Sequence, residues 1–157
     1  IKKMNIALFA SGTGSNVKNI INFFVQDNYV TSIQNTIRGL HFQLNYPQAK
    51  LLHCLKGKIF DVAVDIRKDS PHCGKWVGEE LSEGNRHQLF IPVGFAHGYS
   101  VLSDTAEISY KCSEIYHPED EHGIIWNDPD IAIEWLITNP IISEKDKILP
   151  QFSDFIK

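Results

Sequence analysis

Short apolar runs recur at close intervals from about residue 25 onward, and turn residues separate them. Between Ile59 and Asp65, apolar residues alternate with polar or small ones, which is the period of a half-buried β-strand. The run at 51–55 reaches this strand through Lys56-Gly57-Lys58, so the two runs predict a β-hairpin. Further strands are predicted at 76–81, 87–91, 98–102 and 107–112. Many short strands with little helix predict an all-β sandwich or barrel.

The first 24 residues follow a different pattern from the rest of the chain. A short apolar run at 5–10 predicts a strand, and the loop that follows it is rich in glycine and hydroxyl groups. The apolar positions between Val17 and Phe24 then repeat at helical spacing. Such a strand, loop and helix can hold a phosphate, but it is as often a plain turn and helix cap. We expect residues 1–24 to form an atypical segment whose stretch at 6–9 adds an edge strand to a β domain at 25–157.

Composition and charge bound the classes of function. The chain has 157 residues, of which 43% are hydrophobic and 22% charged, and this fits a single globular domain. The net charge of -4 comes without a basic block, which argues against nucleic acid or a membrane surface as a partner. No apolar run approaches the roughly 18 residues that span a bilayer. The three cysteines are odd in number and lack a CxxC spacing, which favours reduced thiols in the cytoplasm over a disulfide framework.

Several short polar motifs supply the candidate chemistry. Arg38-Gly39-Leu40-His41, the stretch at 94–98, Tyr110-Lys111 and the stretch at 143–146 contain a base, an acid and a cationic anchor. Such a set can move a proton next to a carbonyl group. The glycine of the first motif lets the backbone come close to a neighbouring group. The seven histidines are spread out, with no His-x-His and no HExxH pattern, so we expect no catalytic metal.

The alternation of side chains along a strand predicts which way the side chains around Tyr110 point. It puts Ile108, Tyr110 and Cys112 on one face, and if that face lines a barrel, the Tyr110 hydroxyl points into the cavity. An inward tyrosine more often only packs, and a lone histidine such as His41 is more often structural than catalytic. Asp146 could orient a distant imidazole, but the sequence alone does not pair them. Ser143 is expected to cap a short helix near the C-terminus.

A further set of motifs is specific because the motifs occur together and in order. They are Phe24–Asn28, Ile37–His41, Phe60–Asp65, Gly74–Gly78, Ile91–Gly98, Leu102–Glu107, Trp126–Pro129 and Ser143–Asp146. On these motifs the chain resembles the dTDP-4-dehydrorhamnose 3,5-epimerase family of the cupin superfamily, from about residue 24 to residue 148. No single motif would be specific, but the ordered set covers about four-fifths of the chain.

The resemblance implies a fold and a reaction. The fold is a cupin-type jelly roll (a double-stranded β-helix) with a short C-terminal helical segment. The reaction is the cofactor-free 3,5-epimerisation of dTDP-4-dehydro-6-deoxy-D-glucose to dTDP-4-dehydro-L-rhamnose. The C4 ketone acidifies the protons on C3 and C5, and reprotonation from the opposite face inverts each carbon. The resemblance also implies a homodimer without a metal, whose small-molecule partner is the dTDP-4-dehydro-6-deoxyhexose substrate.

The resemblance also implies roles for individual residues. His41 matches the base, Asp146 the carboxylate that orients it, and Tyr110 the acid. Lys50 matches the lysine near the ketone oxygen or the sugar, and Asp61 is expected to support the histidines. The other implied substrate contacts are Gln26, Asn28, Arg38, His97, Tyr116, Glu121 and Lys145. Among these, Arg38 and His97 match diphosphate and sugar contacts, and Tyr116 matches the ring that stacks on thymine.

The opening segment resembles a different family. Residues 4–24 do not match the epimerase family's N-terminal region, and they resemble the start of glycinamide ribonucleotide formyltransferase, whose loop holds the substrate phosphate. The remaining sheet and catalytic residues of that family are missing, so formyl transfer is not expected. Two alternatives to a double epimerase stay open. One is a catalytically impaired cupin that binds nucleotide sugars without the usual N-terminal contacts, and the other is a related 5-epimerase or ketoisomerase.

Overall fold

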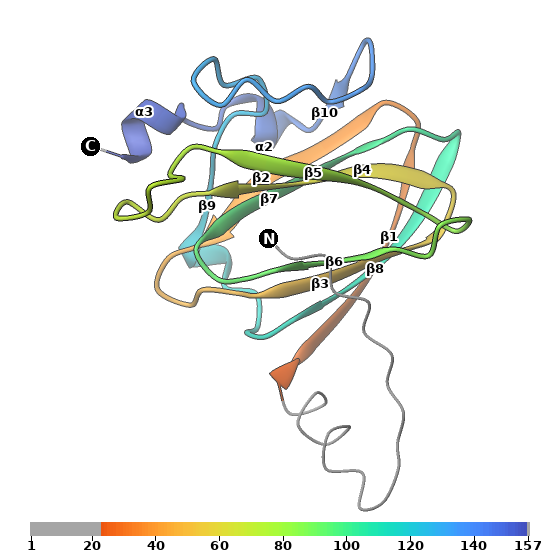
Figure 1. Ribbon diagram of the computed structural model, residues 1–157, viewed down its shortest axis with the longest axis horizontal. Coiled ribbons are helices and arrows are strands. Elements are labelled where there is room, and N and C mark those ends of the chain that lie inside the picture. Colours follow the sequence, from red (N-terminus) through yellow and green to blue (C-terminus); the bar gives the residue numbers. More distant parts are fainter. Residues whose placement is uncertain (1–22, 157) are drawn as a thin grey trace, which may run out of the picture.

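The computed structural model describes residues 23–156, which fold into two β-sheets packed face to face (Figure 1). The first sheet has the strand order β1-β8-β3-β6. Its strands are β1 (Gln26–Ile33), β8 (Thr105–Cys112), β3 (Lys50–Lys56) and β6 (Gln88–Ile91). The second sheet has the order β10-β2-β7-β4-β5, with β9 also paired to β2. Its strands are β10 (Ile141–Ile142), β2 (Thr36–Gln43), β7 (Phe95–Val101), β4 (Lys58–Asp65), β5 (Trp76–Ser82) and β9 (Glu121–Gly123).

Most neighbours in these sheets are far apart in the sequence. β1 pairs antiparallel with β8 along its whole length, and β2 pairs antiparallel with β7. The short β10 is the parallel exception, and it runs beside the start of β2. This arrangement is a jelly roll, and it confirms the all-β prediction.

The link between β3 and β4 is a crossing between the two sheets. β3 pairs with β6 and β8, whereas β4 pairs with β5 and β7, so the predicted hairpin is wrong. Gly57 makes the crossing with a φ of +76°, and a Cβ at this position would lie 2.1 Å from the carbonyl oxygen of Thr105. A glycine turn suits a hairpin and a crossing equally well, and long-range pairing decides between them.

The prediction that the strand at 59–65 is half-buried is also wrong, because both faces of β4 are buried. Ile59 and Ala63 belong to the core between the two sheets, together with Leu52 and Ile108. Val62 points the other way, into a second core on the outer face of the second sheet. The alternation along β4 therefore separates two cores from each other, and does not separate core from solvent.

The C-terminal part of the chain covers this outer face (Figure 1). Trp135 and Phe152 belong to the same buried cluster as Val62. As predicted, Ser143 caps a short helix, α2 (Glu144–Lys147), because its hydroxyl accepts a hydrogen bond from the N–H of Asp146. A final helix, α3 (Phe152–Phe155), ends the described chain. The segment that buries the outer core therefore also positions Asp146.

The helices of the described chain are short, and the predictions for the N-terminal segment fall outside it. None of the helices within residues 23–156 is long and apolar enough to cross a membrane. The strand, loop and helix expected before residue 23 lie outside the described residues, and so does the edge strand expected at 6–9. Those expectations, and the boundary between segments 1–24 and 25–157, stay predictions.

Candidate active site

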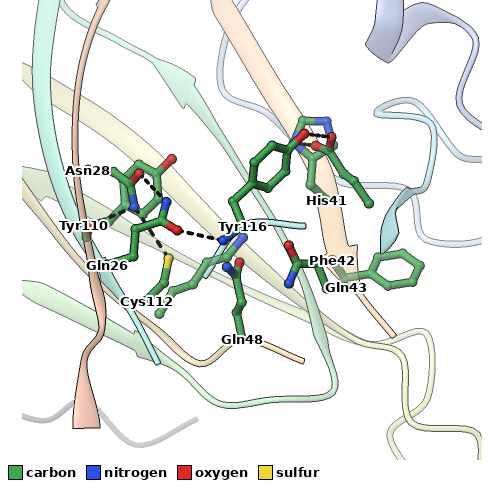
Figure 2. Close-up of a pocket in the computed structure, with 11 residues that line it drawn as sticks. Gln26, Asn28, His41, Phe42, Gln43, Gln48, Tyr110, Cys112 and Tyr116 are labelled. Carbon is green, nitrogen blue, oxygen red and sulfur yellow. Dashed lines mark hydrogen bonds and ion pairs between the residues drawn. The ribbon is translucent and has the colours of Figure 1, made fainter. Parts of the chain in front are cut away.

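A cavity opens between the two sheets, and the candidate residues surround it. It has two adjoining parts of about 290 Å³ and about 340 Å³, and His41, Lys50 and Tyr110 line both of them. The first part, drawn in Figure 2, is also lined by Gln26, Asn28, Phe42, Gln43, Gln48, Cys112, Tyr116 and Glu121. The second part is also lined by Val30, Arg38, His97 and Tyr99. The three shared residues therefore stand where the two parts meet.

Strand register explains why one wall of the cavity carries these side chains. Gln26 on β1, Cys112 on β8 and Lys50 on β3 form one cross-strand row. Asn28 and Tyr110 form the next row on the same face. The predicted inward orientation of Tyr110 and Cys112 is confirmed, because both line the cavity. A one-residue slip of β8 would turn both side chains away from it.

The opposite wall carries a histidine paired with a buried carboxylate. Nε2 of His41 on β2 lies 2.7 Å from Oδ1 of Asp146, and Asp146 is only 1% exposed. Burial alone would raise the pKa of Asp146, but hydrogen bonds from His41 and from the N–H of Gly39 outweigh it and lower the pKa. An ionised carboxylate only accepts hydrogen bonds, so in the neutral imidazole Nε2 carries the proton and Nδ1 keeps its lone pair. This arrangement is suited to a base at His41.

Gly39 brings this pair close to the next strand. Its φ is +110°, and a Cβ there would lie 2.5 Å from the carbonyl oxygen of His97 and 2.7 Å from Cα of Gly98. The glycine in the motif at 38–41 therefore permits a close backbone approach, as the sequence predicts. Its N–H also donates to Oδ2 of Asp146 at 3.3 Å.

A second histidine–carboxylate pair lies beside the first, because His41 and His97 are cross-strand partners. Nε2 of His97 is 2.6 Å from Oδ1 of Asp61, which is fully buried. Burial lowers the pKa of His97 and outweighs the opposite effect of Asp61, which favours the neutral imidazole. Asp61 therefore stands behind His97, the position of a residue that would orient a histidine.

Tyr110 and Lys50 supply an acid and a cation to the same space. Burial raises the pKa of Tyr110 to about 12, which keeps its hydroxyl protonated at neutral pH. Burial lowers the pKa of Lys50, and the nearby Cys112, Asp61 and Glu121 partly offset this. A partly desolvated ammonium interacts strongly with an anion that forms beside it.

The rim of the first part is built from Tyr116, Glu121 and Lys145. Oε2 of Glu121 accepts hydrogen bonds from the hydroxyl of Tyr116 and from Nζ of Lys145. Burial alone would raise the pKa of Glu121, but these hydrogen bonds outweigh it and lower the pKa. The Glu121 carboxylate in turn raises the pKa of Tyr116 to about 12. In Figure 2 the Tyr116 hydroxyl points to the corner that His41 occupies.

A chain of amides joins the rim to the wall (Figure 2). The N–H of Tyr116 donates to Oε1 of Gln26 at 2.7 Å, and Nε2 of Gln26 donates to Oδ1 of Asn28 at 2.8 Å. Nδ2 of Asn28 then donates to the carbonyl oxygen of Tyr110 at 3.4 Å. Nδ2 of Asn28 also donates to Sγ of Cys112 at 3.7 Å, so both of its N–H groups face the protein, whereas Gln26 keeps a second N–H that a ligand can use.

The structure thus brings all twelve residues implied by the resemblance to one place. Ten line the cavity or its rim, and Asp146 and Asp61 stand behind the two histidines. The sequence reasoning missed Gln43, Gln48 and Tyr99. Tyr99 follows His97 by two positions, so strand alternation could have found it. The Gln43 amide donates a hydrogen bond to the carbonyl oxygen of Ile115, and the Gln48 amide donates one to that of Glu114. No local sequence pattern predicts such contacts.

In the part of the chain that the structure describes, no group of three or more His, Cys, Asp or Glu side chains could hold a metal ion. The arrangement can instead take a proton with His41, give one with Tyr110 and stabilise an anion with Lys50. The jelly roll and this site together define an acid–base isomerase. A sequence model of the dTDP-4-dehydrorhamnose 3,5-epimerase family matches residues 7–154, and the chain belongs to that family.

Individual relatives agree with the family match. The dTDP-4-dehydrorhamnose 3,5-epimerase of Methanothermobacter thermautotrophicus is 54% identical over 127 residues, which cover 79% of this chain and 69% of the relative. The Escherichia coli protein of the same name is 54% identical over 136 residues, covering 85% of this chain and 74% of the relative. The crystal structure of dTDP-6-deoxy-D-glucose-3,5-epimerase from Legionella pneumophila in complex with dTDP-4-keto-L-rhamnose has a TM-score of 0.83 at 43% identity. That match covers 91% of this chain and 78% of the Legionella chain, and the predicted cupin-type jelly roll is confirmed.

Proposed function

We propose that this protein converts dTDP-4-dehydro-6-deoxy-D-glucose to dTDP-4-dehydro-L-rhamnose by inverting C3 and C5. One observation carries the proposal: the His41–Asp146 pair and the protonated Tyr110 line a single cavity. The relatives named above, one of them in complex with dTDP-4-keto-L-rhamnose, support the choice of substrate. The C4 ketone of the sugar stabilises the carbanion, so the proposed steps need no cofactor.

His41 is the proposed base. Asp146 holds the proton on Nε2, so Nδ1 can take the proton from C3 or C5. The carboxylate also stabilises the imidazolium that results, as an aspartate does in a catalytic triad. The electron pair of the broken C–H bond moves into the sugar and forms an enolate at the C4 oxygen.

Tyr110 is the proposed acid and Lys50 the proposed partner of the enolate oxygen. Tyr110 gives its proton to the carbon from the face opposite to the base, which inverts the centre. Because burial raises its pKa to about 12, Tyr110 enters each step as the neutral phenol. The half-buried Lys50 side chain lines the same cavity, and its ammonium is proposed to offset the developing negative charge.

The remaining residues are proposed to bind the nucleotide sugar. Arg38 and His97 line the second part of the cavity and are placed to meet the diphosphate and the sugar. Gln26 and Asn28 line the first part, where Gln26 offers an N–H donor and Asn28 orients the Gln26 amide. The exposed ring of Tyr116 is a platform on which thymine can stack, and Glu121 and Lys145 complete this rim.

We also propose a homodimer in the cytoplasm, with no nucleic-acid or membrane partner. Val25, Tyr29 and Ile33 share the outer face at β1 with Asp27 and Thr31, and the three are 56%, 60% and 58% exposed. A row of exposed apolar side chains on an edge strand is suited to burial against a second copy. The free thiols of Cys54, Cys73 and Cys112 suit a reducing compartment.

Proton exchange measured by NMR tests the proposed function. The full chain is incubated with dTDP-4-dehydro-6-deoxy-D-glucose in D2O, and C3 and C5 are followed. We expect deuterium at both carbons, and we expect His41→Ala to abolish exchange at both. Exchange at one carbon would instead indicate a 5-epimerase or another narrow isomerase. A folded protein that binds the substrate without exchange would be the catalytically impaired binder.

A further inference from the structure

His41 has a second carboxylate neighbour besides Asp146. Oε1 of Glu121 lies 3.9 Å from Nδ1 of His41, the nitrogen that faces away from Asp146. Glu121 opens β9, and β9 pairs with β2 so that Glu121 stands opposite Gln43 and Gly123 opposite His41. The strand pairing therefore fixes Glu121 beside the nitrogen of His41 that keeps its lone pair.

The two carboxylates differ in their access to solvent. The side chain of Asp146 is 2% exposed, and its second oxygen is taken by the N–H of Gly39. The side chain of Glu121 is 13% exposed, and its second oxygen contacts Tyr116 and Lys145. Tyr116 is 46% exposed and the Lys145 side chain 56% exposed. The His41 side chain is itself 25% exposed, and Glu121 joins its Nδ1 side to the exposed Tyr116 and Lys145, whereas Asp146 is a closed end.

Both oxygens of Glu121 already face protein groups, namely Tyr116 and Lys145 on one side and His41 on the other. A carboxylate held at the working nitrogen of a base is placed to receive that nitrogen's proton.

The proposed reaction gives this proton transfer a purpose, and the inference rests on that reaction. Inverting two carbons uses the base twice, so His41 must lose its first proton before it can take the second. Tyr110 must likewise regain the proton that it gave. A sugar nucleotide bound in the cavity would separate His41 from bulk water between the two inversions.

We propose that Glu121 is the proton outlet of His41 between the two inversions. In each inversion the C–H bond breaks, its proton goes to Nδ1 of His41, and its electron pair stays on the enolate. Tyr110 then protonates the opposite face and becomes a phenolate. The Nδ1 proton passes to Oε1 of Glu121 and from there to water, and a water proton returns Tyr110 to the phenol. One proton leaves and one enters, so the enzyme is restored.

The distance of 3.9 Å is longer than a hydrogen bond, so the transfer needs either a bridging water or a closer approach. A closer approach is favoured once His41 becomes positively charged, because Glu121 is then its opposite charge at the open side of the ring. Glu121 acts through His41, and it is a positioning and relay residue that need not touch the reacting carbons.

The test compares Glu121→Gln with the unaltered protein and with Glu119→Gln, which removes the same charge from an exposed side chain two positions away. Each full-length protein is mixed with dTDP-4-dehydro-6-deoxy-D-glucose in D2O, and the two carbons are followed separately by NMR. We expect Glu121→Gln to slow the second inversion by about a hundredfold, the lower end of general acid–base effects, so that a singly inverted sugar accumulates. Glu119→Gln should show no such accumulation.

Two further measurements separate a relay from a merely structural role. Imidazole added to Glu121→Gln should speed the second inversion in proportion to its concentration, because a small buffer can carry the proton in place of Glu121. Glu121→Asp, which keeps a carboxylate, should restore part of the rate without imidazole.

The outcomes are distinct. If Glu121→Gln slows both inversions equally, or only raises KM, or shows no response to imidazole, Glu121 is a substrate or structural contact and the inference is overturned. If the unaltered protein exchanges no proton at C3 or C5, the proposed function is wrong, and the inference that rests on it is wrong as well.

Discussion

Asp146→Asn tests the base most directly, because it removes one charge and nearly keeps the shape of the side chain. Oδ1 of Asp146 lies 2.7 Å from Nε2 of His41, and Oδ2 accepts from the N–H of Gly39 at 3.3 Å. The backbone N–H of Asp146 donates to Ser143 and is unchanged by the substitution. We therefore expect the variant to fold and the defect to lie in proton transfer.

The size of the defect follows from the hydrogen bond that is lost. A hydrogen bond to a charged group contributes about 1.5–3 kcal/mol, and this corresponds to about a 10- to 150-fold loss of rate. The asparagine amide can also donate to Nε2 of His41 and place the ring proton on Nδ1. The corresponding aspartate-to-asparagine change in a serine protease lowers kcat by about 10⁴. We expect kcat to fall between these limits while KM changes little, because the lost interaction forms mainly in the transition state.

The assay measures kcat, KM and the exchange rates at C3 and C5 in D2O. Asp69→Asn is the matched control, since it removes the same charge from an exposed position outside the cavity. Urea unfolding of both variants shows whether stability is retained. An Asp146→Asn protein that folds and keeps the kcat of the unaltered protein would refute the view that Asp146 holds His41 as a base.

Three other changes test the acid, the close approach of the strands and the ion pair between the buried Asp65 and the exposed Arg67. Tyr110→Phe should slow inversion by about 10²–10⁴, with a smaller effect on the removal of the substrate proton, and NMR in D2O would show loss of the C–H signal outpacing product formation. Gly39→Ala should lower the urea midpoint and activity together, because its Cβ would lie 2.5 Å from a carbonyl oxygen at a φ of +110°; an unchanged midpoint would argue against that constraint. The hydrogen bond from Arg67 holds the pKa of Asp65 well below its usual range. The stability from this pair is therefore full above the unfolded pKa of about 4 and is lost as the pH falls through the folded pKa, so Asp65→Asn should flatten the acid limb of a stability–pH curve.

The sequence pattern predicts the strands well but not their partners. The alternation from Ile59 to Asp65 is real, yet both of its faces are buried because the C-terminal segment covers the outer one. The turn at Gly57 is also real, but it crosses between sheets. In both cases the deciding contacts come from residues far along the chain, which a local pattern does not contain.

The same limit applies to the site. Strand alternation alone predicts that Tyr110 and Cys112 face inward, and both line the cavity. The pairing of His41 with Asp146 joins positions 105 residues apart, and only the resemblance to a family suggested it. The contact between Glu121 and Nδ1 of His41 had no signal at all, because it depends on the register of β9 against β2.

The C-terminal segment that covers the outer face of the second sheet has two structural roles. It buries Trp135 and Phe152 in the outer core, and a few residues earlier than Phe152 it delivers Asp146 to His41. The sheets between which the substrate would lie are held together by a different core. Local opening of the C-terminal segment would therefore separate Asp146 from His41 and abolish its function as a base, while the two β-sheets stay folded. On heating, such a protein would become inactive before it melts, and a substitution at Trp135 would act on catalysis from the far side of the sheet.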